Sequence, residues 1–169
     1  MAAEFPVDDE YFNQSVRLLK RLMEAGRLDS VGMNEIANLR VVRSVRTGQT
    51  ILHVAADAGN VQVVDVLART MREEQLEITD NEGFTALARV TCNGNRRLVE
   101  GMLRRNQNLI SIQNDKGNVP AVAALHDGNL GLARYLYPLT KGKILGPEND
   151  IVGPTVLCEA IYNKALGKN

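Results

Sequence analysis

The stretch Thr47-Gly48-Gln49-Thr50-Ile51-Leu52-His53-Val54-Ala55-Ala56-Asp57-Ala58-Gly59-Asn60 decides the fold, because residues 82–95 and residues 116–129 repeat its frame. In each copy a second glycine follows the first by eleven residues, and asparagine comes directly after it. The first glycines lie 35 and 34 residues apart along the chain. The glycine pairs are Gly48 and Gly59, Gly83 and Gly94, and Gly117 and Gly128. A fixed period of this length predicts a stack of repeated structural units.

Each copy predicts a turn followed by two helices. The first glycine ends an extended turn, where a positive φ costs glycine little. Thr50 and Thr85 come two residues later and suit a helix N-cap, whose hydroxyl satisfies an unpaired backbone N–H. Pro120 suits the first helical position of the third copy. About two turns of small and apolar residues follow, and the second glycine ends that helix.

A second helix is predicted directly after the second glycine of each copy. Its apolar residues recur at spacings of three and four, the period of one buried helix face. They are Val61, Val63, Val64, Val66 and Leu67, then Leu98, Val99, Met102 and Leu103, then Leu130, Leu132, Ala133 and Leu136. One helix pair cannot bury its apolar face alone, so the copies are expected to stack around a continuous core.

The repeat extends beyond the three clear copies. Residues 12–23 predict a helix with Phe12 and Leu19 facing inward, and Gly26 lies 33 residues before Gly59. Residues 153–160 repeat the Gly-x-Thr-x-Leu frame near the end of the sequence. Residues 1–10 are expected to form a frayed tail.

We therefore predict one domain over residues 1–169. It divides into a degenerate N-terminal repeat (11–43), three repeats (44–79, 80–113 and 114–147) and a partial or capping repeat (148–169).

This frame resembles the ankyrin repeat, which has a period near 33 residues and the string Thr-Pro-Leu-His-x-Ala. Copy one reads Thr50-Ile51-Leu52-His53-Val54-Ala55, with isoleucine in place of proline. Copy two has Ala88 in place of the histidine, and copy three has Val119 in place of the threonine. The resemblance implies an all-α ankyrin-repeat solenoid of stacked helix-turn-helix units, with β-turn tips projecting along one edge. It also implies a protein-binding function.

A narrower resemblance is to plant ankyrin-repeat proteins, carried by residues 48–59, 80–83 and 135–140. In that family the repeats precede a C-terminal membrane-spanning domain of the PGG type and serve stress and defence signalling. No part of this sequence resembles the membrane domain. The resemblance implies a cytoplasmic chain, placed at the cytosolic face of a membrane if a missing C-terminal domain tethers it.

Composition argues against several other classes of function. Twenty basic residues balance twenty acidic ones over 169 residues, whereas nucleic-acid binders normally carry a basic excess. No apolar run approaches the roughly 18 residues of a membrane span. The two cysteines and two histidines show no metal-ligand spacing, and no phosphate-binding loop is present. We expect no metal, no cofactor, no catalytic residue and therefore no enzyme.

The ankyrin resemblance also implies which positions recognise a partner. They are the two residues before the turn glycine, the residue after it, and the ninth and tenth residues after it. In this chain they are Arg46, Thr47, Gln49, Asp57 and Ala58, then Asn81, Glu82, Phe84, Cys92 and Asn93, then Asp115, Lys116, Asn118, His126 and Asp127.

Several of these residues allow two interpretations. Phe84 is either an exposed aromatic anchor at a turn tip or a side chain folded back onto the neighbouring turn. Cys92 is either an inert thiol or a reactive one whose pKa Arg89 lowers. His126 and Asp127 are adjacent on a helix and so do not face each other, which favours a solvated pair over a catalytic base.

His53 occupies the motif position and is expected to bridge turns through both ring nitrogens. For the whole chain, we expect a module that binds a protein partner through its turn tips and concave first helices. The alternative is a cytosolic regulatory domain of a membrane protein, which contacts anionic lipid or a small ligand through basic faces. Those faces are Arg96, Arg97, Arg104 and Arg105, and residues 17–46 with a net charge of +4. A solvated convex surface is the simpler explanation of both, because local charge clusters are usually solvated faces.

Overall fold

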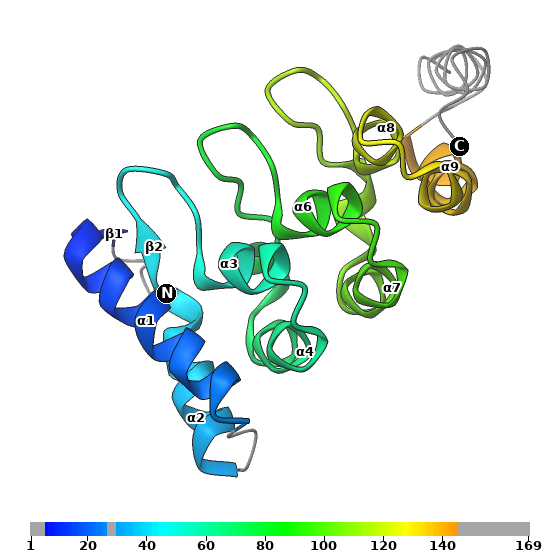
Figure 1. Cartoon of the computed structure of the whole chain (residues 1–169). Coiled ribbons are helices and arrows are strands. Elements are labelled where there is room, and N and C mark those ends of the chain that lie inside the picture. Colours follow the sequence, from blue (N-terminus) through cyan, green and yellow to red (C-terminus); the bar gives the residue numbers. More distant parts are fainter. Residues whose placement is uncertain (1–5, 27–29, 145–169) are drawn as a thin grey trace.

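The computed structural model describes residues 6–26 and 30–144. In this described part the chain forms paired helices that stack side by side into a curved slab, and long turns project from one side of it (Figure 1). The all-α repeat architecture expected from the sequence is confirmed.

The three central copies each contain the expected pair of helices. The first helices are α3 (Ile51–Asp57), α6 (Ala86–Cys92) and α8 (Pro120–His126). The second helices are α4 (Val61–Thr70), α7 (Arg96–Arg105) and α9 (Leu130–Ile144). The first helices form a row next to the projecting turns, and the second helices form an outer row (Figure 1).

Short helical segments lead from each second helix to the next turn. They are η1 (Leu39–Val41), α5 (Glu73–Leu76) and η2 (Gln107–Ser111). Each of them buries leucine side chains, such as Leu76 and Leu109, beneath the helix pairs. These segments therefore close the core between successive units.

The N-terminal unit holds α1 (Asp9–Glu24) and α2 (Ser30–Asn38). Before α1, strand β1 (Pro6–Val7) pairs in parallel with β2 (Arg43–Ser44). The expectation of a frayed tail is therefore wrong for residues 6–10. Asp8 caps α1 by accepting the Tyr11 N–H at 2.8 Å, and Asp9 accepts the Ser44 hydroxyl at 2.6 Å. The expected partial repeat at 148–169, including Cys158, lies outside the described residues.

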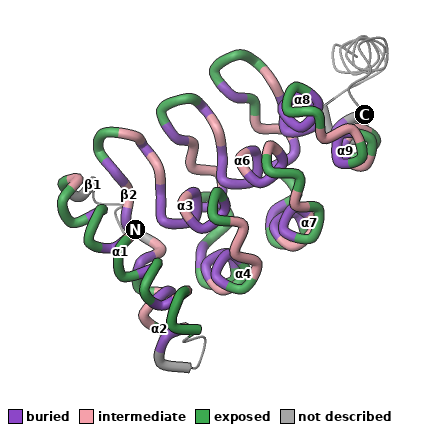
Figure 2. The backbone as a smooth tube through the Cα atoms, viewed as in Figure 1, coloured by how far each residue is buried: buried purple, intermediate pink, exposed green. Residues whose placement is uncertain are grey.

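The core is built largely from small and aliphatic side chains. Ala55, Ala56, Ala121 and Ala124 are completely buried between neighbouring helices. Buried residues face the interior of the slab, whereas exposed residues cover the turn tips and the outer surfaces (Figure 2). Alanine lets helices pack closely, so the interior reaches normal density with few aromatic rings.

The helix ends use the residues that the sequence singles out. Thr85 caps α6 by accepting the Ala88 N–H at 3.2 Å, as predicted. Thr50 is the N-cap of α3 and forms a capping box with His53, whose Nδ1 also lies 2.9 Å from the Thr50 hydroxyl. After the second glycines, Asn60 and Asn95 cap α4 and α7.

Asn129 has a different role from its counterparts Asn60 and Asn95. Its side-chain amide donates hydrogen bonds to the carbonyls of Thr91 (3.2 Å) and Cys92 (2.6 Å) at the end of α6. A β-carbon on Gly94 would lie only 2.6 Å from the Oδ1 of Asn129, which is too close for both atoms to keep their positions. Asn129 therefore joins the second and third copies.

We predict that Gly94→Ala destabilises the protein more than Gly59→Ala. Both glycines have a positive φ, which costs alanine about 1–2 kcal/mol. At Gly94 the new methyl group would also displace Asn129. At Gly59 the new methyl group would have no other atom within 4 Å. We expect the loss of unfolding free energy at Gly94 to be at least twice that at Gly59, as measured by urea denaturation. Equal losses would contradict the proposed contact.

Candidate functional site

The projecting turns are shaped by one polar side chain at the start of each. In the second turn, Asp80 Oδ1 accepts the backbone N–H groups of Glu82 (2.9 Å) and Phe84 (3.0 Å). In the third, Asn114 Oδ1 accepts the N–H groups of Lys116 (3.0 Å) and Asn118 (2.9 Å). Asp and Asn commonly hold turns in this way. Sequence analysis missed this role, although each residue lies three positions before its turn glycine.

The first turn is one residue longer than the other two. Ser44 takes the place of Asp80, and its hydroxyl accepts the Thr47 N–H at 3.1 Å. The Gly48 N–H bonds to the carbonyl four residues earlier, whereas Gly83 bonds to the carbonyl three residues earlier. This residue precedes Gly48 and so does not lengthen the interval to Gly83. The interval is 35 residues instead of 34 because Asp80 follows the end of α4 by ten positions, whereas Asn114 follows the end of α7 by nine.

Adjacent turns are joined by backbone hydrogen bonds. The Asn81 N–H donates to the Thr47 carbonyl at 3.0 Å, and the Asp115 N–H donates to the Glu82 carbonyl at 3.3 Å. The Asn81 side-chain amide adds a bond to the Arg46 carbonyl at 2.7 Å. The turn tips therefore form one connected row.

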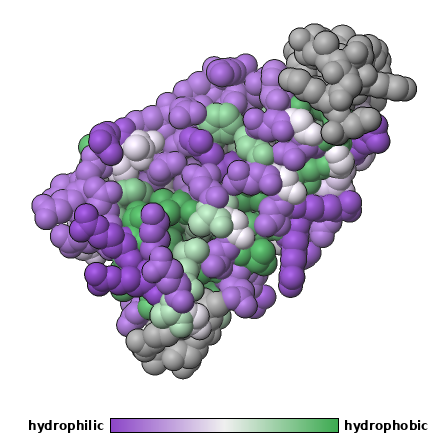
Figure 3. Space-filling model, in the orientation of Figure 1, coloured by the Kyte–Doolittle hydropathy of each residue, from purple (hydrophilic) through white to green (hydrophobic). Residues whose placement is uncertain are grey.

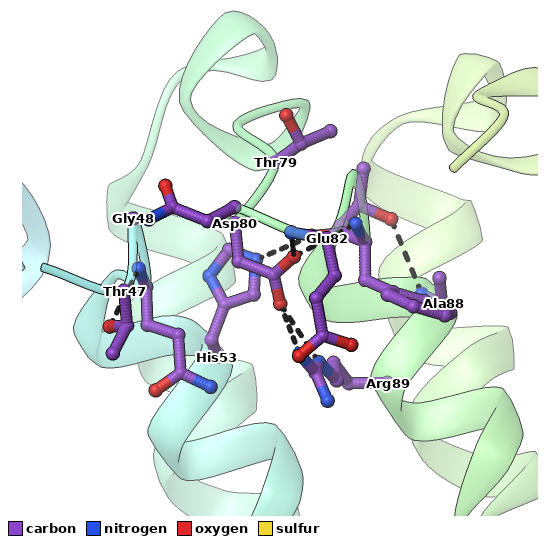
Figure 4. A network of polar contacts seen from close by, with 12 residues as sticks. Thr47, Gly48, His53, Thr79, Asp80, Glu82, Ala88 and Arg89 are labelled. Atoms are coloured by element: carbon purple, nitrogen blue, oxygen red, sulfur yellow. Dashed lines mark hydrogen bonds and ion pairs between the residues drawn. The ribbon is translucent and has the colours of Figure 1, made fainter. Parts of the chain in front are cut away.

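His53 connects this row to the helices beneath it (Figure 4). Its Nδ1 accepts the Thr50 N–H at 3.1 Å, and its Nε2 bonds to the Phe84 carbonyl at 2.9 Å. The expectation that His53 bridges turns through both nitrogens is confirmed. Because Nδ1 is an acceptor, the ring is neutral with its proton on Nε2. Burial lowers the pKa of His53, which favours this neutral form.

Arg89 lies on the concave side of α6, between the two turns (Figure 4). Its Nε donates to Asp80 Oδ2 at 2.9 Å, and its Nη2 lies 3.5 Å from Glu82 Oε1. Burial alone would raise the pKa of Asp80, but hydrogen bonds from Arg89 and from two backbone N–H groups outweigh it and lower that pKa. The guanidinium also lies 5.0 Å from the centre of the Phe84 ring.

Of the two interpretations of Phe84, the fully exposed anchor does not fit the structure. The side chain is half-buried, because Arg89 stacks on its ring. Arg89 in turn is fixed by its bonds to Asp80, which itself is buried. Only part of the Phe84 ring remains for contact with a partner.

A hollow of about 270 Å³ lies at the junction of the first two turns. Its lining includes Asp80, Arg89 and the predicted recognition residues Arg46, Thr47, Gln49, Asn81 and Glu82. Asp57 stands nearby at the end of α3, where burial and the carboxylates of Asp80 and Glu82 raise its pKa against the opposing effect of Arg89. Asp57, Asp80 and Glu82 thus gather around Arg89, and Arg46, the second arginine of the lining, lies 3.8 Å from Asp9.

All fifteen predicted recognition residues retain exposed surface. The exposed ones are Arg46, Asp57, Ala58, Asn81, Glu82, Asn93, Asp115, Lys116, His126 and Asp127, and the half-buried ones are Thr47, Gln49, Phe84, Cys92 and Asn118. Hydrophilic atoms cover most of the turn edge in the space-filling view (Figure 3). The concave surface therefore offers mainly hydrogen bonds and charge.

Cys92 is a half-buried free thiol at the end of α6. The pKa of the Cys92 thiol is raised to about 12. Burial is the larger cause, and a hydrogen bond from the thiol to the Asp127 carboxylate is the second. Arg89 acts in the opposite direction but is outweighed. The interpretation of Cys92 as an activated thiol is therefore wrong, because its thiolate is scarce near neutral pH.

Several arginines of the basic faces are engaged in the fold. Arg43 donates to the carbonyls of Gly48 and Thr79, and Arg105 donates to those of Ala68 and Arg69. Arg96 pairs with Glu100 at 2.7 Å. The basic residues of the two predicted faces therefore divide into structural and solvent-exposed groups. None of the helices within residues 6–26 and 30–144 combines the length and apolar character needed to cross a bilayer.

Comparison with known proteins agrees with this architecture. Residues 10–111 match the sequence model of ankyrin repeats in three copies, which is more than half of the chain. This chain therefore belongs to the ankyrin-repeat family, whose members are generally protein–protein interaction modules.

Among curated relatives, diacylglycerol kinase iota of Rattus norvegicus is 32% identical over 101 residues, and that of Homo sapiens is 31% identical over the same length. The match covers 59% of this chain but only 10% of each kinase.

We predict that Asp80→Asn is tolerated better than Asp80→Ala. Asparagine keeps the acceptor for both turn N–H groups, as Asn114 does in the next turn, and loses only the charge opposite Arg89. Alanine leaves both N–H groups and the guanidinium without Asp80, and we expect a loss of about 2–3 kcal/mol in unfolding free energy. Thermal and urea denaturation of both variants measure the difference. A smaller loss for alanine than for asparagine would refute this role.

We further predict that the unfolding free energy decreases as the pH is lowered, because of His53. Its folded-state pKa lies below the ordinary value of 6.5, so the unfolded chain binds its proton more readily. The unfolding free energy should therefore decline as the pH falls below about 6.5, towards the lowered pKa. His53→Gln should reduce this decline, and His126→Gln, which alters an exposed histidine, should preserve it. Identical pH profiles for the wild type and His53→Gln would exclude His53 as the cause.

Proposed function

We propose that this chain is a non-enzymatic module that binds another protein through its turn tips and the concave face of α3, α6 and α8. The observation that carries this proposal is the row of backbone hydrogen bonds from turn to turn, such as that from Asn81 to the Thr47 carbonyl. It holds the recognition positions of different copies at fixed distances from each other.

Rigidity of this kind favours binding. A surface that is already ordered loses little conformational entropy when a partner docks on it. The buried polar groups beneath the surface are satisfied by internal bonds, as His53 and Asp80 illustrate. The exposed side chains above them can therefore vary without disturbing the turn.

The partner surface is expected to be polar and to carry basic groups opposite the first two turns. Asp57 and Glu82 provide negative charge there that Arg89 only partly balances. Complementary charge raises association rates and excludes partners of the wrong sign. The half-buried Phe84 adds a limited apolar contact.

We propose a cytoplasmic location and a role in plant stress or defence signalling on the resemblance of residues 48–59, 80–83 and 135–140 alone. The relatives named above are mammalian and do not add support to that part. The membrane tether through a further C-terminal domain rests on the same resemblance.

A binding experiment tests the concave surface. The immobilised chain captures proteins from cell extract, and the captured protein is then purified and titrated against variants. We predict that Asn93→Arg and Lys116→Glu each weaken its affinity at least tenfold, because both replace exposed residues on the proposed contact surface.

Gln62→Arg is the matched control, since Gln62 is exposed on the outer helix α4. Its affinity should equal that of the wild type. If Gln62→Arg weakens binding while the two concave variants leave it unchanged, the partner contacts the outer helices and the proposal is wrong.

A further inference from the structure

The outer row of helices contains a second, unrelated furrow. It lies between α7, η2 and α9, and has a volume of about 620 Å³. Its lining is Glu100, Leu103, Arg104, Gln107, Ile110, Tyr135, Pro138 and Leu139. None of these residues belongs to the concave surface described above.

The furrow arises because α9 packs differently from the other outer helices. Helix α7 packs directly on α4, whereas α9 packs mainly on α8 and on η2 and has little contact with α7. The side chains of Leu103 and Ile110 therefore form an apolar floor between α7 and α9. On α9, Leu139 keeps 44% of its surface exposed, and among the leucines of the described ranges only Leu18 is comparably exposed.

The lining of the furrow includes one unpaired arginine. Arg104 is exposed and has no acidic partner among the described ion pairs. Glu100 is the one acidic residue in the lining, and Arg96 neutralises it at 2.7 Å while lying over the Tyr135 ring. The furrow thus combines an apolar floor with uncompensated positive charge.

The corresponding furrow between α4 and α7 is smaller. Its volume is about 240 Å³, and its lining combines apolar side chains such as Val64 and Leu98 with Arg97 and Arg104. Arg69 and Asp65 also line it and form an ion pair at 2.9 Å. The wider separation of α9 from α7 therefore distinguishes the furrow beside α9 by its size.

We propose that the furrow between α7 and α9 binds an acidic amphipathic helix of a partner protein. Such a helix places apolar residues at spacings of three and four into a hydrophobic groove. Its acidic residues would then lie beside Arg104. The volume exceeds that of one side chain and lies within the roughly 300–1,000 Å³ typical of binding pockets.

A membrane surface fits these observations less well. Polybasic attachment to anionic lipid takes clusters of about 4–8 exposed Lys and Arg. Of the four arginines on α7, Arg105 is bonded to carbonyls of the preceding copy and Arg96 is paired with Glu100. A flat bilayer would also leave the floor of the furrow empty.

A peptide selection on the full chain tests the proposal. One display library presents helices with leucine at spacings of three and four and glutamate elsewhere, and a second library has lysine in place of glutamate. We expect enrichment from the acidic library only. The selected peptides should bind Leu139→Asp and Arg104→Glu at least tenfold more weakly than the wild type.

Controls on α1 match these variants, since Leu18 is 38% exposed and Arg17 is exposed. Leu18→Asp and Arg17→Glu should bind the peptides as the wild type does, and so should the concave variant Asn93→Arg. The proposal is overturned if neither library is enriched, if the lysine library is enriched equally, or if the selected peptides tolerate Leu139→Asp. A lipid ligand is the alternative outcome. It would be shown if no peptide is enriched, if the protein sediments with phosphatidylserine vesicles, and if Arg104→Glu abolishes that sedimentation.

Discussion

The close approach of adjacent turns is the constraint on which the rest of this structure depends. A β-carbon on Gly48 would lie 2.9 Å from the Asn81 backbone nitrogen, and one on Gly83 would collide with the Asp115 backbone. Without side chains at these points, the turns come near enough to share backbone hydrogen bonds. That spacing then determines how far apart the first helices stack and where the recognition residues lie.

Polar residues in this protein divide into two groups with different functions. Asp80, Asn114 and His53 are buried, and their hydrogen bonds replace those that water would make to the turn backbone. Residues such as Asn93 and Lys116 lie above them in solvent. Because the buried group maintains the turns, the exposed group is free to determine which partner binds.

The same stacking produces two surfaces of opposite character. Along the turns, carboxylates outnumber the arginine that they share, and the surface is polar. On the outer row, the departure of α9 from α7 uncovers an apolar floor with basic residues beside it. A chain without net charge therefore presents an acidic concave face and a basic, partly apolar furrow, and the two can be occupied independently.

The sequence by itself determined the period and the helix limits, because glycines, caps and apolar spacing act within about ten residues of chain. The bridge from His53 to Phe84 spans 31 positions, and it was expected only from the motif position that His53 occupies. The sequence left the exposure of Phe84 open, since it depends on Arg89, whose orientation Asp80 fixes. The pairing of β1 with β2 and the raised pKa of Cys92 involve residues more than 30 positions apart. Only the tertiary structure decided these features and the furrow beside α9, because burial and charge at a side chain depend on neighbours that local pattern does not specify.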